Sequence, residues 1–156
     1  MYSLIQSNMD EEVQNWMETI DDSRYNYLEG MTSGKIQSEK EEVLQEYNEE
    51  QKKQWLEKLS SYRVVDNLQD LRLGKYCRWI VLGNQPPVLH GGGYLIKVSF
   101  MDNGVYLTCE RMKKYKMQVN MDNAVIFQKL TAEELILVMA NDYVEGERSS
   151  PLPPSI

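Results

Sequence analysis

The spacing of apolar residues changes near Leu71, and this change divides the sequence into a helical part and a sheet-forming part. Before Leu71 the apolar residues recur with the 3.6-residue period of an amphipathic helix. After it they alternate with polar residues, as in a strand with one buried face. Asn103-Gly104 separates two of the alternating stretches. Both residues tolerate positive φ angles, so this dipeptide predicts a tight β-hairpin.

Two helices are predicted before Leu71, over residues 7–28 and 38–62. Acidic residues near the start of the first helix suit the positive end of its dipole. Ser38 and Glu41 have the spacing of a capping box at the start of the second helix. The apolar stripes of the two helices either pack on each other in a helical hairpin or bind a partner, which is a second copy or another protein. In the latter case the candidate partner-binding residues are Trp16, Tyr47, Trp55 and Leu59.

Five short strands are predicted after Leu71 from the alternation of apolar residues. They cover residues 75–82, 93–100, 105–112, 114–119 and 124–129. Sequential antiparallel strands joined by tight turns favour a small closed barrel of SH3-like or OB-like size. Thr131 and Glu134 have the spacing of another capping box and predict a short helix. Residues 135–140 of this helix are apolar on all sides, so we expect it to plug the barrel or to lie against the N-terminal helices.

These patterns together predict an α+β fold with an N-terminal helical hairpin, a five-stranded antiparallel barrel and a short C-terminal helix. The expected regions are an acidic arm (1–66), the barrel with its terminal helix (67–142) and a mobile Pro- and Ser-rich tail (143–156). The charges are distributed unevenly along the chain. Residues 1–70 carry 16 acidic and 7 basic side chains, whereas residues 71–130 carry 3 acidic and 9 basic ones. The two regions therefore either attract each other or face different partners.

The sequence HGGG at residues 90–93 is similar to the oxyanion-hole turn of lipases and esterases. Those enzymes need a G-x-S-x-G nucleophile elbow and a further His as base, and the chain contains neither. The spacing permits a dyad of this His with Cys77 or Cys109, but no other residue supports one. The chain has no phosphate-binding loop, and two Cys and one His are too few for a zinc site. We therefore expect a non-enzymatic protein with no catalytic residue, metal or cofactor, in which the glycines form a turn.

The two cysteines are expected to be buried free thiols, because they lie in predicted strands and form no CxxC motif. A disulfide between neighbouring strands is the alternative. The N-terminal sequence lacks the features of a secretory signal, and no apolar run is long enough to cross a bilayer. We therefore expect an intracellular protein in a reducing compartment.

Basic residues alternate with a tyrosine where two predicted strands meet, and Arg72, Lys75 and Arg78 add to this basic side. Such a surface binds single-stranded nucleic acid through phosphate contacts and base stacking, although the net charge of −7 opposes it. The other interpretations are a solvated sheet edge, on which lysines prevent aggregation, and a site for an anionic protein. The candidate nucleic-acid-binding residues are Arg111, Lys113, Lys114, Tyr115 and Lys116.

Residues 68–137 contain a succession of three segments, LxxLRLGKYCRWI, LHGGGYL and NAVIFQKLTAEELIL. A Gly-aromatic-Arg strand thus precedes a double-glycine turn and a late Phe-x-Lys segment. This succession resembles uncharacterised small proteins of nucleocytoplasmic large DNA viruses. The resemblance covers under half of the chain and includes no catalytic residue. It implies a minor structural or assembly component, in the host cytoplasm or the virion, that binds capsid proteins or itself through the N-terminal helices. The alternative function is single-stranded nucleic-acid binding by the basic patch.

Overall fold

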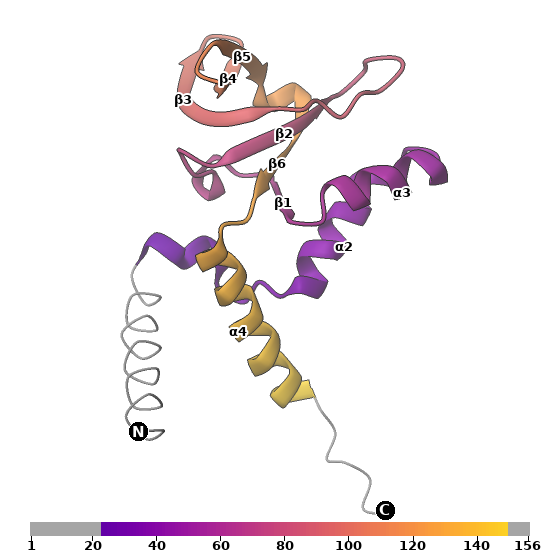
Figure 1. The fold of residues 1–156 in the computed structure, drawn as a ribbon, viewed down its shortest axis with the longest axis vertical. Helices are drawn as coiled ribbons and strands as arrows, with labels where there is room; N and C mark the ends of the chain where they lie inside the picture. Colours follow the sequence, from indigo (N-terminus) through magenta and orange to yellow (C-terminus); the bar gives the residue numbers. More distant parts are fainter. Residues whose placement is uncertain (1–22, 150–156) are drawn as a thin grey trace, which may run out of the picture.

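The computed structural model describes residues 23–149, which form an α+β fold with a curled antiparallel sheet and helices outside it (Figure 1). The sheet has the strand order β1-β6-β2-β3-β4-β5. Its six strands in the described residues are β1 (Tyr62–Val65), β2 (Tyr76–Val81), β3 (Gly93–Met101), β4 (Gly104–Arg111), β5 (Tyr115–Asn120) and β6 (Ala124–Lys129). Short 3-10 helices, η2 (Leu68–Asp70) and η3 (Met121–Asn123), precede β2 and β6.

The prediction of a closed five-stranded barrel is wrong in its strand count and in its closure. The additional strand, β1, pairs antiparallel with β6, and each of its four residues is buried. β1 thereby occupies the edge of β6 that a closed barrel would pair with β5. In the described part of the chain, β1 and β5 therefore remain the two edges of an open sheet.

The inner face of the curled sheet carries the main apolar core, to which all six strands contribute. Its strand residues are Val65, Cys77, Trp79, Leu95, Leu107, Cys109, Val119 and Ile126. A bulge in β3 shifts the pairing with β4 between Leu95 and Lys97. Because one extra residue exchanges the two faces of a strand, both Leu95 and Val98 pack in this core. The simple alternation expected over residues 93–100 is therefore interrupted at Ile96.

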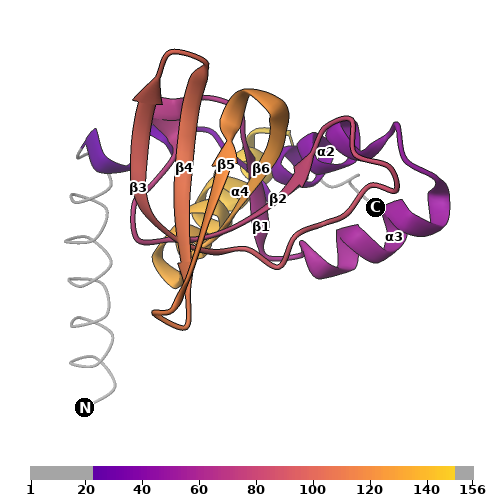
Figure 2. The same ribbon diagram turned by 90° about the horizontal axis from the view of Figure 1, so that it is seen from above.

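The outer face of β1, β6 and β2 is covered by two helices, α2 (Ser33–Leu44) and α3 (Glu49–Lys58). The sequence predicted one helix over residues 38–62 here. The chain instead breaks after α2 and restarts at Asn48, whose side chain accepts a hydrogen bond of 2.8 Å from the Gln51 N–H. The N-cap of α2 is Thr32 rather than Ser38. Figure 2 shows these two helices on one side of the molecule and β3, β4 and β5 on the other.

The C-terminal helix α4 (Ala132–Ser149) begins with the predicted capping box. The Glu134 N–H donates to Thr131 Oγ1 at 3.2 Å, and the Thr131 N–H donates back to Glu134 Oε1 at 2.9 Å. The helix continues past residue 142, where a tail was expected. It lies outside the sheet and packs through Leu137 and Val138 near α2 and the 3-10 helix η1 (Ser23–Leu28). No helix within residues 23–149 combines the length and the apolar character that crossing a bilayer requires.

Candidate functional site

The HGGG sequence forms a corner that leads into β3 and brings three backbone segments close together. Gly92 has a φ angle of +72°, and a Cβ at this position would overlap the carbonyl oxygen of Cys77. A Cβ at Gly91 would lie 2.8 Å from Nη1 of Arg111. Gly92 is needed for close packing, which is the structural role that the sequence predicted, whereas at Gly91 the exposed Arg111 side chain can move away.

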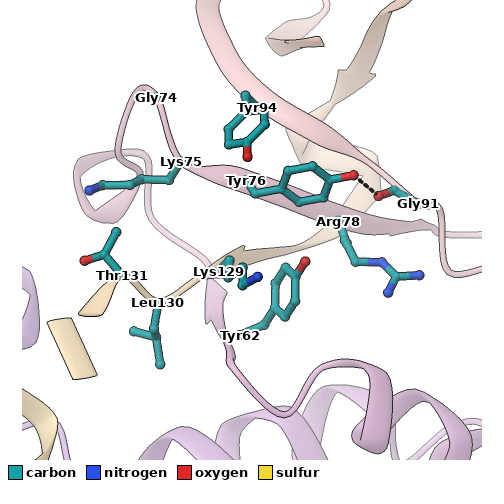
Figure 3. A pocket seen from close by; sticks show the side chains of 10 residues that line it. All are labelled: Tyr62, Gly74, Lys75, Tyr76, Arg78, Gly91, Tyr94, Lys129, Leu130 and Thr131. Atoms are coloured by element: carbon teal, nitrogen blue, oxygen red, sulfur yellow. Dashed lines mark hydrogen bonds between the residues drawn. The ribbon is translucent and has the colours of Figure 1, made fainter. Parts of the chain in front are cut away.

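A pocket of about 500 Å³ lies beside this corner, where the helical cover of the outer sheet face ends (Figure 3). The pocket has basic and aromatic walls, and none of its lining residues is acidic. The residues that give it this character are Tyr62, Lys75, Tyr76, Arg78, Tyr94 and Lys129.

The register of the sheet explains why these side chains meet. Tyr62 pairs with Lys129 between β1 and β6, and Tyr76 pairs with Tyr94 between β2 and β3. Cys77 of β2 pairs with Gln128 of β6, and Tyr76 and Lys129 are the next residues along these two strands. The Tyr62–Lys129 pair therefore lies beside the Tyr76–Tyr94 pair. The row continues through β4 to β5. Across the sheet it reads Tyr62, Lys129, Tyr76, Tyr94, Glu110 and Lys116.

Two tyrosines form the aromatic wall of the pocket. The rings of Tyr76 and Tyr94 meet edge to face, with centroids 5.0 Å apart and planes at 88°. The Tyr76 hydroxyl donates a hydrogen bond of 2.7 Å to the carbonyl oxygen of Gly91, which fixes this ring (Figure 3). Tyr94 is 55% exposed. The arrangement leaves the Tyr94 ring available to a planar ligand.

Arg78 and Tyr62 border the opposite side of the pocket. The Arg78 Nε donates a hydrogen bond of 3.0 Å to the carbonyl oxygen of His90. This bond uses one of the five N–H donors of the guanidinium and fixes its position. Burial raises the pKa of Tyr62, while the positive charge of Arg78 opposes that rise. Tyr62 therefore remains a neutral phenol, and Arg78 is a fixed positive charge at the pocket rim.

The predicted basic patch forms the turn between β4 and β5. All five of its residues are exposed: Arg111, Lys113, Lys114, Tyr115 and Lys116. Met112 and Lys113 both have a φ of 58°, which is costly for residues other than glycine. Because Arg111 lies against Gly91, the structure brings the start of this patch to the pocket.

Sequence reasoning identified part of the pocket and missed the rest. Lys75 and Arg78 were recognised as part of the basic side, whereas Tyr62, Tyr94 and Lys129 were not recognised as site residues. The signal of Tyr94 and Lys129 in the sequence is their outward position in alternating strands, whereas Tyr62 has no such signal because every residue of β1 is buried. Only the strand order, with β6 between β1 and β2, places them together.

The helix residues predicted to bind a partner have a different setting. Trp55 and Leu59 are buried against the sheet in the protein's own core. Tyr47 packs edge to face on Trp55, with ring centroids 4.9 Å apart. Trp16 lies outside the described residues.

His90 and the two cysteines pack against other parts of the protein. The His90 ring stacks on Trp79 with centroids 5.9 Å apart, and its buried Nε2 has no hydrogen-bond partner among the described residues. Cys77 and Cys109 are buried free thiols, as predicted and as suits a reducing environment. A hydrogen bond with Cys77, together with burial, raises the pKa of Cys109. Residues 23–149 contain no group of three or more His, Cys, Asp or Glu side chains placed to hold a metal ion.

Comparisons with protein-family models, with curated proteins and with solved structures gave no match to this chain.

Proposed function

We propose that this protein is a single-stranded nucleic-acid-binding module whose site is the tyrosine-lined pocket together with the basic β4–β5 turn. The observation that carries the proposal is the row of side chains across the sheet. It places exposed Tyr94 between basic groups on both sides, Lys129 towards β6 and Lys116 towards β5.

Each part of the surface matches one part of a nucleotide. Phosphates are bound by Lys and Arg side chains, here the half-buried Lys75 and Arg78 and the exposed Lys129 in the pocket, and the exposed Arg111 beside it. A base stacks on an aromatic face without regard to sequence, and Tyr94 offers such a face. The strained turn at Lys113 extends the positive charge beyond the pocket. The expected ligand is thus a flexible single strand with splayed bases.

The net negative charge of the chain does not oppose this assignment locally. Acidic side chains are concentrated in the sequence before β2, whereas residues 71–130 carry 9 basic and 3 acidic side chains. Glu110 is the one carboxylate in the row, where it lies between Tyr94 and Lys116. A local basic surface of this kind dominates contact with a nearby phosphate, because salt screens charges more than about 8–10 Å away.

The test is the fluorescence anisotropy of labelled dT and rU oligonucleotides of about 12 nucleotides, titrated with the full chain at several salt concentrations. Log affinity is expected to fall linearly with log salt. Lys75→Ala and Lys129→Ala should each reduce the magnitude of the slope by about 0.7. Tyr94→Ala should weaken binding by about 1–3 kcal/mol without changing the slope.

Lys53→Ala is the matched control, because Lys53 is an exposed lysine of α3 that lines a separate, acidic groove. It should leave affinity and slope unchanged. Absence of binding at low salt would contradict the proposal. Equal competition by polyglutamate would show that charge alone is recognised, and it would contradict the stacking role of Tyr94.

The expectation of a virion or assembly component stays a prediction from the sequence resemblance. A self-associating protein is the second candidate function, and the exposed apolar side of α4 favours it.

A further inference from the structure

The outward side of α4 is apolar along most of its length. Five large side chains on it are 39% to 69% exposed: Leu135, Ile136, Met139, Tyr143 and Val144. Ala132 and Ala140 lie on the same side and are also exposed. At 100° per residue these positions span about half of the helix circumference, from Leu135 to Val144, opposite the buried residues, and the exposed Glu133 lies near the Val144 edge. An apolar face of this extent on a helix marks an interaction surface.

The inner side of α4 is fixed by specific contacts, so the helix cannot rotate to bury its outer face. The Asn141 Nδ2 donates to the carbonyl oxygens of Leu28 (3.0 Å) and Met31 (2.8 Å). Asp142 accepts hydrogen bonds of 2.8 Å from both the N–H and the hydroxyl of Ser33. Figure 1 shows α4 extending away from the sheet.

The outer residues are arranged symmetrically about the middle of the helix. Their positions are 132, 135, 136, 139, 140, 143 and 144, and all except 132 form pairs that are equidistant from the point between Met139 and Ala140. Two such helices packed antiparallel would place Ile136 opposite Tyr143, and Met139 beside the small Ala140. A two-fold interface needs this self-complementarity, because the same patch of both copies forms it: if residue i contacts residue j of the partner, residue j also contacts residue i of the partner.

We propose that the outer face of α4 is a homodimer interface, in which it packs antiparallel on α4 of a second copy of this chain. The exposed parts of the five large side chains amount to roughly 500 Å² per copy, at about 200 Å² for a whole side chain. Two copies thus supply about 1,000 Å² of buried surface from these side chains, which reaches the lower range of specific interfaces. Ala132, Ala140 and the helix backbone add to this area.

Sedimentation of the full chain over a range of concentrations tests the proposal. The wild-type protein should show a mass twice that of the 18.3-kDa chain. Met139→Glu should give the monomer mass, because it places like charges next to each other at the axis. Leu73→Glu is the matched control, since Leu73 is 64% exposed but lies before β2, and it should remain dimeric. Circular dichroism checks that both variants are folded.

Disulfide trapping tests the antiparallel arrangement independently. Ile136→Cys mixed with Tyr143→Cys should form a cross-linked dimer under mild oxidation. Ile136→Cys alone should not, because the two copies of residue 136 would be about 10 Å apart along the helices, at 1.5 Å per residue. A disulfide needs Cα atoms within about 7 Å. Cys77 and Cys109 are buried and stay out of the reaction.

Three results would overturn the proposal. The first is a wild-type protein that stays monomeric at every concentration. In that case, resistance of a Met139→Cys variant to alkylation would show that residues 1–22 of the same chain cover the face instead. The second is a dimer that survives Met139→Glu. The third is cross-linking of Ile136→Cys with itself.

Discussion

The buried ammonium group of Lys40 donates a hydrogen bond of 2.9 Å to the carbonyl oxygen of Leu59, the residue that ends α3. Lys40 is only 1% exposed, and its second acceptor is the carbonyl oxygen of Ser60 at 3.5 Å. Carbonyl groups at a helix C-terminus attract a positive charge. These two hydrogen bonds therefore join α2 to the C-terminal end of α3, just before β1.

Stability should depend on pH through Lys40. Burial lowers its pKa in the folded protein below the ordinary value of 10.5, so the unfolded chain binds more protons between the two values. The free energy of unfolding should therefore rise with pH across this alkaline window, and the penalty should be fully present below the folded-state pKa. Urea unfolding of the wild type and of Lys40→Met at several alkaline pH values measures how the difference between their free energies of unfolding changes with pH. A constant difference between the two proteins would contradict the prediction.

Gly92→Ala should destabilise the protein by about 3 kcal/mol or more, because the added methyl group overlaps the Cys77 carbonyl oxygen and Gly92 has a positive φ. Gly83→Ala separates the two causes. Gly83 has a φ of +86° but open space around its Cβ position, so only backbone strain of about 1 kcal/mol is expected. Chemical denaturation gives both values, and equal losses would show that the contact with Cys77 is unimportant.

The open sheet and the missed strand have a single physical origin. β1 is buried on both faces, so it has no alternation for sequence reasoning to detect. It also contains Arg63, a residue that strands rarely bury. Arg63 is accommodated because its Nη2 donates to the Asp70 carbonyl oxygen at 2.6 Å and to Gln128 Oε1 at 3.0 Å. Neither partner is predictable without the tertiary fold.

Local signals were sufficient where the determining interaction was also local. The hairpin and the capping box at Thr131 each involve residues within four positions of one another, and both are present. The turn of the hairpin is Asp102-Asn103 rather than Asn103-Gly104, because Gly104 already pairs with Met101.

The pocket behaves differently. Tyr62 and Lys129 are 67 positions apart, and they meet only because β1 pairs with β6. The basic composition was sufficient to predict a binding surface, whereas predicting that Tyr62 and Tyr94 belong to it would have required the strand order.

Tyr27→Phe should destabilise the protein by about 1–3 kcal/mol. The Tyr27 hydroxyl donates a hydrogen bond of 2.6 Å to Oε2 of the buried Glu134, so its removal leaves this carboxylate with one partner fewer. The remaining positive neighbour, the Arg63 Nε, is 3.9 Å away. Tyr106→Phe is the control, because it loses an exposed hydrogen bond of 2.7 Å with Asn103 and should cost under about 0.5 kcal/mol. Similar losses in thermal unfolding of the two variants would argue against a buried role for the Tyr27 hydroxyl.

Glu110→Gln should strengthen nucleic-acid binding, because Glu110 is the carboxylate that interrupts the basic and aromatic row between Tyr94 and Lys116. Removing a partly exposed charge near a phosphate is worth about 0.5–1 kcal/mol at high effective dielectric, or roughly a threefold gain in affinity. The gain should shrink as salt is added, since screening weakens the repulsion that the substitution removes. Asp122→Asn changes the same charge at an exposed residue of η3, outside the row, and should have a smaller effect. If Glu110→Gln weakened binding, the strand would follow a path away from the row, and the site would have to be placed at the β4–β5 turn alone.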